Sequence, residues 1–389
     1  MLGLVLAGGA ARGAYEAGVL RFLLRELPRR IGHVPWPDVV SGTSVGALNG
    51  MFAAARDLDE LDSLTRRWRQ MEIGHVYRLR RRDVLKAIRS AWRANGPFAL
   101  FDVAPLHEMV RREFPRRALR RAIDSCECRA FIVSATELLT GYNSLFIDSK
   151  DVRLDLKPLP GARVYAESIG PEHVLASSAL PFLFPPVPLH PGLHVDGGLR
   201  QNTPLRPLLR AGADRVLVIG LKRTAEDEGT TVPADVIPNL SFLAGKSLNA
   251  LVLDPVERDL RQTRDINRFL EWGHERFGRE FTDGAEQDLG LRQIHTLFIN
   301  PTEDLGRIAA ETFRSRPPRV SGPLRAMLAT IADRGHASES DLLSYLYFDR
   351  AFTAQLEQLG FEDAQRKESQ IVELLDTESV ALGPQPSQG

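Results

Sequence analysis

The sequence has very little cysteine, and its charges balance. Only two of its 389 residues are cysteines, Cys126 and Cys128, and its 50 basic residues equal its 50 acidic residues in number. So few cysteines exclude a disulfide scaffold, and a C-x-C pair by itself makes a poor disulfide and no zinc site. We expect two free thiols in a reducing compartment, with no metal and no cofactor. The zero net charge gives no support to nucleic-acid binding.

Long uninterrupted hydrophobic runs are also missing. The N-terminal "MLGLVLAGGAARG" has no basic residues before its apolar stretch, and glycines interrupt it early, so we expect no secretory signal here. The longest apolar stretch, 174–189, contains four prolines and cannot form a membrane-spanning helix. We expect a cytoplasmic protein, with any membrane contact peripheral.

Basic residues are nevertheless clustered in two segments. "RLRRRD" at 78–83 and "RREFPRRALRR" at 111–121 are local arginine groups. They fit solvated helix faces, and they also fit contact with anionic lipid headgroups, where each basic residue near a membrane gains about 1 kcal/mol. The sequence supports both interpretations and indicates no oligomeric state.

The chain begins with two strand–turn–helix units. An apolar strand at 2–7 leads through a glycine-rich turn into a helical pattern at 14–27. A second strand, "PDVVSG", leads in the same way into "VGALNGMFAAARD". Such units in succession predict an α/β fold with a largely parallel sheet.

The remaining chain alternates helical blocks with strands. The sequence predicts mainly helices at 57–125, a polar loop at 224–239 and long helices at 240–276. The helical block 57–125 and the loop 224–239 are candidate lids. Further strands are predicted at 129–138, 143–148, 193–202, 215–221 and 296–301. We divide the chain into a catalytic α/β domain at 1–316, a helical C-terminal extension at 317–378 and a disordered tail at 379–389.

The pattern G-x-S-x-G occurs in "SGTSVG", with Ser44 between Gly42 and Gly46. After a strand and before a helix, this pattern is typical of a nucleophile elbow, a sharp turn that lifts the serine hydroxyl above the sheet. The helix N-terminus then favours negative charge developing beside it. We predict that Ser44 is a nucleophile.

A serine nucleophile needs a base, and the sequence offers two kinds. Three histidines lie late enough for a Ser–Asp–His order, but none sits in a marked turn: His274, His295 and His336. Asp196 ends a predicted strand and enters the glycine turn "VDGG", which puts a carboxylate at the edge of a sheet. Asp-Gly-Gly can also be simply a turn. His194, two residues earlier, shares a face with Asp196.

The first glycine turn, "GGAARG" at 8–13, suits an anion. Backbone N–H groups at the start of a helix bind a phosphate or an oxyanion. A dinucleotide-binding loop is a poorer fit, because Ala10 replaces the second glycine of G-x-G-x-x-G and no acidic residue is evident at the ribose position.

Four segments together resemble the patatin-like phospholipase family, and two further segments, "LGRIAAETF" and "LLSYLYFDRAFTAQLEQLGFEDA", resemble a bacterial subgroup of it. "LAGGAARGAYEAGVL", "SGTSVGALNG", "ASSALPFLFPPV" and "VDGGLRQNTPL" occur in the family's order. The resemblance implies a three-layer α/β/α fold, a mostly parallel central sheet and a Ser–Asp dyad without histidine. It matches Ser44 to the nucleophile and Asp196 to the base, within the elbow glycines Gly42 and Gly46 and the turn glycines Gly197 and Gly198.

The same resemblance implies an oxyanion hole at the first glycine turn, from Gly8, Gly9, Ala10, Arg12 and Gly13. Ala10 departs from the family, which usually has a third glycine, and alanine tolerates positive φ poorly. Arg12 is expected to steady this loop, to face a lipid phosphate, or to form a structural ion pair.

The implied function is hydrolysis of fatty-acyl esters in a lipid or lysolipid through an acyl-enzyme. The apolar segment 174–189 is then either an acyl-chain wall or a core loop, and its Ser177 and Ser178 are interpreted as structural. Two alternatives stay open. One is an acyltransferase that uses the same serine with a histidine, and the other is a non-catalytic scaffold for regulation or membrane binding.

Overall fold

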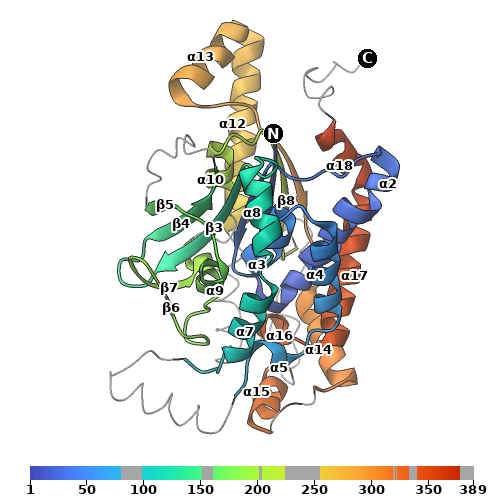
Figure 1. Cartoon of the computed structure of the whole chain (residues 1–389). Helices are drawn as coiled ribbons and strands as arrows, with labels where there is room; N and C mark the ends of the chain where they lie inside the picture. The colour runs from blue at the N-terminus through green and yellow to red at the C-terminus, as the bar shows by residue number, and fades with distance from the viewer. Residues whose placement is uncertain are drawn as a thin grey trace, which may run out of the picture.

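The chain folds around one mixed β-sheet, seen here in a computed structural model (Figure 1). The structure describes residues 1–79, 99–150, 161–200, 204–223, 255–318, 320, 322–332 and 340–376. The predicted loop at 224–239 and the predicted tail at 379–389 lie outside these ranges.

Nine strands of the described chain form the sheet. Their order is β5-β4-β3-β2-β1-β8-β9, with β7 paired to β3 and β6 paired to β7. Strands β3, β2, β1, β8 and β9 run parallel, which confirms the mostly parallel sheet. Strands β4 and β7 pair antiparallel with β3, a feature that the repeated strand–turn–helix pattern did not predict. The bounds are β1 Leu2–Leu6, β2 Val39–Thr43, β3 Ala130–Glu137, β4 Asn143–Asp148, β5 Ala162–Ala166, β6 Val187–Leu189, β7 Gly192–Asp196, β8 Arg215–Ile219 and β9 His295–Ile299.

Both faces of the sheet are apolar. Alternate residues of a strand point to opposite faces, so apolar residues in succession supply both. Leu4 and Leu6 of β1 join one hydrophobic cluster, whereas Val5 between them joins the other. The first cluster contains α1 (Ala14–Arg21), α3 (Val45–Ala54) and α17 (Arg350–Arg366); the second contains α10 (Leu205–Arg210) and part of α12 (Pro255–Phe277). Helices on both faces give the three-layer α/β/α arrangement that the sequence predicted.

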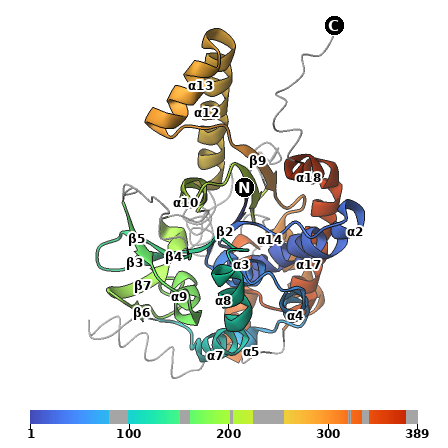
Figure 2. The ribbon, with the colours of Figure 1, turned by 45° about the horizontal axis from the view of Figure 1, so that its top comes forward.

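The remaining helices surround this frame. In both views α12 and α13 form a hairpin that projects from the body (Figures 1 and 2). The predicted helix at 14–27 continues beyond α1 through a π-helical turn, Phe22–Glu26. The other helices are α2 Pro28–Ile31, α4 Leu58–Arg69, α5 Ile73–Val76, α7 Ala104–Glu113, α8 Arg116–Asp124, α9 Pro171–Ser177, α13 Arg279–Leu289, α14 Leu305–Ser315, α15 Gly322–Ala332, α16 Ser340–Leu346 and α18 Glu368–Leu375.

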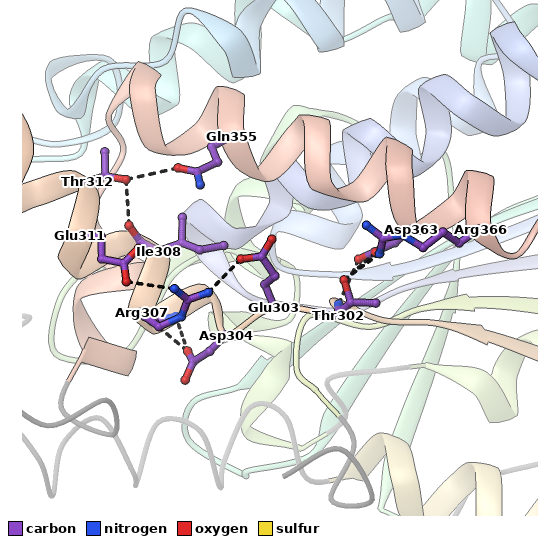
Figure 3. A network of polar contacts seen from close by, with 11 residues as sticks. Thr302, Glu303, Asp304, Arg307, Ile308, Glu311, Thr312, Gln355, Asp363 and Arg366 are labelled. Carbon is purple, nitrogen blue, oxygen red and sulfur yellow. Dashed lines mark hydrogen bonds and ion pairs between the residues drawn. The ribbon is translucent and has the colours of Figure 1, made fainter. Parts of the chain in front are cut away.

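The C-terminal helices pack into the same core as the sheet. Phe352 and Leu356 of α17 are fully buried with α1. Polar contacts tie α17 to the chain around α14: Thr302 bonds Asp363 through both its amide and its hydroxyl, at 3.0 and 2.8 Å, and Thr312 reaches Gln355 at 3.5 Å (Figure 3). The boundary at residue 317 stays a prediction, but the helices beyond it share a hydrophobic core with the segment before it.

Both cysteines are free thiols, Cys126 exposed and Cys128 buried. Burial raises the pKa of the Cys128 thiol to about 12, which makes it an inert core residue. Of the helices that the structure describes, none is long and apolar enough to cross a membrane.

Candidate active site

Ser44 is the single residue between β2 and α3, and its backbone conformation is strained. Its φ is 55° and its ψ is −124°, although it is not a glycine. Such a conformation costs about 1–3 kcal/mol and persists only where the surroundings enforce it. This is the geometry that the G-x-S-x-G pattern predicted for a nucleophile elbow.

Neighbouring backbone atoms lie too close to the Cα atoms of Gly42 and Gly46 for either residue to carry a side chain. A Cβ on Gly46 would lie 2.3 Å from the carbonyl oxygen of Leu6, and a Cβ on Gly42 would lie 2.3 Å from the carbonyl oxygen of Gly46. Helix α3 therefore starts directly against the end of β1, close to the first glycine turn.

Strand β3 brings Ser44 and Asp196 together. Thr43, the last residue of β2, pairs with Ser134 of β3, and Asp196, the last residue of β7, pairs with the next residue, Ala135. Because β4 occupies the other edge of β3, β2 and β7 share one edge and meet end to end. Ser44 thus follows β2 at the point where β7 delivers Asp196.

Asp196 is a buried carboxylate beside the Ser44 hydroxyl. Its side chain is 2% exposed, and Oδ1 accepts a hydrogen bond from the amide of Gly198 at 2.8 Å. Burial raises the pKa of Asp196 to about 6, while hydrogen bonding from Ser44 and Gly198 opposes that rise. Oδ2 has no hydrogen-bond partner among the described residues.

The glycine turn after Asp196 lies on β3. A Cβ on Gly197 would stand 2.3 Å from the carbonyl oxygen of Ser134, so a side chain there would push the turn away from the strand. Gly197 keeps Asp196 at the sheet edge, and the Gly198 amide orients its carboxylate.

The first glycine turn forms a short 3₁₀ helix, Ala10–Gly13, beside the elbow. Ala10 has a φ of 51°, so it does adopt the left-handed conformation that alanine disfavours. Ala10 also lines the pocket at Ser44. The amide of Arg12 already donates to the Gly9 carbonyl at 3.1 Å, and the Gly13 carbonyl accepts from Asn49 at 2.9 Å. Of the five predicted oxyanion residues, Ala10 is therefore the one seen at the pocket.

The Arg12 side chain points to the C-terminal helix α16 and not into the pocket. Its guanidinium donates to Ser344 Oγ at 2.8 Å and to Asp341 Oδ1 at 3.0 Å, and it stacks on the Tyr345 ring at 4.2 Å. Of the three roles expected for Arg12, the contacts fit a structural ion pair that steadies the loop.

Replacing Arg12 with leucine is expected to lower the free energy of unfolding by about 2–4 kcal/mol, because it removes the buried guanidinium that bonds Asp341 and Ser344 and puts an apolar side chain beside them. Urea denaturation measures this change. The matched control is Arg29→Leu, since the Arg29 side chain is 75% exposed and its ion pair with Glu26 should contribute under about 1 kcal/mol. Equal losses in the two variants would contradict the assignment.

An apolar pocket extends from Ser44 between α3, α4 and α7. Its cavity volume is about 70 Å³. Side chains from these helices and from the segment 174–189 line it, among them Leu48, Phe52, Leu64, Met109, Leu180 and Phe184. Within the segment 174–189, Leu180 and Phe184 line the pocket, whereas Val174 and Leu175 are core residues.

A buried polar network supports the pocket, and the sequence reading missed it. Asn49 on α3 donates to Gly13 and to Glu16 Oε2, at 2.9 and 2.8 Å, and accepts a bond from the Trp68 indole at 2.9 Å. Burial raises the pKa of Glu16 well above its ordinary range. Asn49 thus joins the first glycine turn, helix α3 and the pocket wall. Its place in "SGTSVGALNG", five residues after Ser44, was the available signal.

None of the described histidines is among the residues that line the pocket at Ser44. His194 is buried on β7, where its ring contacts Ser144 Oγ at 3.0 Å. His274 is on the projecting hairpin, and His295 begins β9, at the opposite end of the parallel strands from Ser44. His336 lies outside the described residues.

Most arginines of the 111–121 cluster are paired within the chain. Arg111 bonds Glu172, Arg112 bonds Glu113, Arg120 bonds Asp148 and Arg121 bonds Asp57. Their charge is largely compensated, which favours the solvated-face interpretation over headgroup contact. In the other cluster, residues 80–83 lie outside the described ranges.

Comparison with known proteins gives one family match. The model of the family described as patatin-like phospholipase matches residues 4–209. Among solved structures, VipD from Legionella pneumophila is 14% identical; the match covers 95% of this chain and 66% of VipD, with a TM-score of 0.38. The ExoU–SpcU complex of the Pseudomonas aeruginosa type III secretion system is 14% identical, with 97% and 72% covered and a TM-score of 0.30. No curated protein matches this chain.

Proposed function

Since the chain belongs to the patatin-like phospholipase family, we propose that it hydrolyses fatty-acyl esters of lipids through a Ser44–Asp196 dyad. Family membership supports lipid hydrolysis in general terms. The dyad, the acyl-enzyme and the phospholipase or lysophospholipase substrate are our proposal.

One observation carries the proposal: a buried carboxylate with a raised pKa faces a serine in a strained turn at the head of an apolar pocket. A carboxylate with an ordinary pKa is a weak base for a serine hydroxyl, and burial strengthens it. The pKa of Asp196 is raised to about 6, so the group is ionised and ready to accept a proton at neutral pH.

The proposed reaction has two steps. Ser44 Oγ attacks the ester carbonyl carbon while its proton passes to Asp196, and collapse of the tetrahedral intermediate sends that proton to the leaving alcohol. Water then attacks the acyl-enzyme, gives its proton to Asp196, and Ser44 leaves with that proton as the fatty acid is released.

Backbone amides are proposed to hold the oxyanion in both steps. Each such donor is typically worth about 2.7–4 kcal/mol of transition-state stabilisation. The amides of Gly9 and Ala10 are the best candidates, because Ala10 lines the pocket and the Arg12 amide is already bonded. The acyl chain would lie along α3, where the walls are apolar.

An acyltransferase with a histidine base has less support. No histidine is among the described residues that line the pocket. A transferase that keeps the Ser44–Asp196 dyad differs only in the acceptor, and product analysis separates the two.

The pH dependence of hydrolysis tests the proposal. For wild-type protein acting on a lysophospholipid and on a short-chain nitrophenyl ester, kcat/KM should rise about tenfold per pH unit below pH 6 and level off above it. The reason is that protonated Asp196 cannot accept the Ser44 proton, and its pKa is raised to about 6. Chromatography of the released fatty acid measures the rate independently of the pH response of nitrophenol. Absence of fatty-acid release, or a flat profile from pH 4 to 8, would contradict the proposal.

A further inference from the structure

The segment Ala176–Leu180 touches both members of the proposed dyad. Ser177 Oγ accepts a hydrogen bond from the backbone amide of Ser44 at 2.8 Å. Two residues later, the carbonyl oxygen of Ala179 accepts a bond from the amide of Asp196 at 2.9 Å. One short segment therefore bonds to the backbone of the nucleophile and of the base.

The Ser177 hydroxyl has a fixed direction. It donates to the carbonyl oxygen of Ser134 at 2.6 Å, and it accepts from Ser44. A backbone N–H can only donate and a carbonyl oxygen can only accept, so the hydroxyl cannot exchange its donor and acceptor roles. Ser177 is fully buried, and water cannot replace it without rearrangement. The elbow is thereby tied to β3 at Ser134, the residue that also contacts Gly197.

This bond acts on the dihedral angle that aims the nucleophile. Holding the Ser44 amide fixes the peptide plane on one side of the Ser44 Cα, and the start of α3 fixes the other side. The rotations between the two planes are φ and ψ, and φ stands at the strained value of 55°. Without an acceptor for the amide, the peptide plane is free to turn toward a more favourable φ and to carry the hydroxyl away from Asp196.

The neighbouring serine has no comparable contact. Ser178 Oγ donates only to the carbonyl of Val174, one turn back in its own helix, at 2.8 Å. From sequence both serines read as structural, and the contacts now separate them.

We propose that Ser177 is a positioning residue that holds the Ser44 elbow in register with Asp196; this rests on the proposed function. Ser177 touches no reacting atom. It acts through the Ser44 amide, and its loss should slow acylation with little effect on substrate binding.

The experiment compares two variants with one control. Ser177→Ala removes the hydroxyl, and Ser177→Cys replaces it with a slightly larger thiol that is a weaker donor and acceptor. The control is Thr312→Val, which removes a buried hydroxyl bonded to the Ile308 carbonyl at 2.8 Å on α14, remote from the site (Figure 3). The readouts are the rate constant for fluorophosphonate labelling of Ser44, kcat and KM on a short-chain nitrophenyl ester, and the melting temperature.

Ser177→Ala should reduce labelling and kcat about 10- to 100-fold with KM within about twofold, as expected for a displaced nucleophile. Ser177→Cys should fall between Ala and wild type, and it tests the proposal even if Ser177→Ala does not fold. Thr312→Val should lose stability but keep both rates. Labelling of Ser177→Cys or Ser177→Ala at the wild-type rate would overturn the proposal. Failure of wild-type protein to be labelled would instead overturn the proposed function.

Discussion

Replacing Ser44 with alanine is expected to lower kcat for ester hydrolysis by at least about 10⁴-fold, because the acyl-enzyme can no longer form. Fluorophosphonate labelling should disappear with it. The fold should persist, since alanine removes one oxygen and the strained turn is set by the surrounding glycines and by the Ser44 amide, which alanine keeps. Ester turnover, labelling and circular dichroism on the same preparation measure all three effects.

A matched control lies three residues earlier on β2. Ser41 is fully buried, and its hydroxyl has no hydrogen-bond partner among the described residues. Ser41→Ala should therefore leave turnover and labelling near the wild-type rates, and it should not reduce stability. If Ser44→Ala kept more than about one hundredth of the wild-type kcat, the nucleophile would have to be another residue.

Asp196→Asn is expected to lower kcat by about 10³–10⁴-fold while the site stays assembled. Asparagine has the same shape and can still accept the Gly198 amide bond, but it cannot take the Ser44 proton. The pH dependence below pH 6 should vanish together with the activity. Steady-state kinetics from pH 4 to 8 measure both changes. Full activity of this variant would eliminate the dyad and return attention to a histidine.

The same variant should be more stable than wild type at neutral pH. The pKa of Asp196 is about 6 in the folded protein against an ordinary 3.8, so the folded state binds more protons between these values. Stability of the wild type therefore falls as pH rises from about 4 to 6, and ionised Asp196 costs up to about 3 kcal/mol above that window. Neutral asparagine escapes this cost, so its advantage in melting temperature should appear at pH 7 and fade by pH 4.

Asp304→Asn is the control for both measurements. Asp304 caps the N-terminus of α14, where its carboxylate accepts hydrogen bonds from the amides of Gly306 and Arg307 at 2.8 and 3.1 Å (Figure 3). It lies away from the pocket, so its amide variant should keep full activity and should not gain stability at pH 7. A similar stability gain in both variants would remove the link to Asp196 burial.

Local pattern was enough to predict an α/β fold with a largely parallel sheet and to single out Ser44. The apolar runs of β1 and β2, each followed by a glycine turn and a helix, indicate parallel strands because the pattern is contained within about 30 residues. The glycines around Ser44 predict the elbow for the same reason, since the strain is local to five residues. "VDGG" marked Asp196 as the end of a strand, but this pattern fits a catalytic base and an ordinary turn residue equally well.

Only the tertiary structure decided how these parts meet. Ser44 and Asp196 lie about 150 residues apart, and they come together because β2 and β7 end at consecutive residues on one edge of β3. That antiparallel pairing has no local signature, because strand register depends on long-range contacts. The partners of Arg12 on α16, Ser344 and Asp341, lie more than 300 residues away and could not be predicted from local sequence either. The pattern around Ser44 is local, whereas the hydrogen bond from the Ser44 amide to Ser177 Oγ joins residues that only the folded chain brings together.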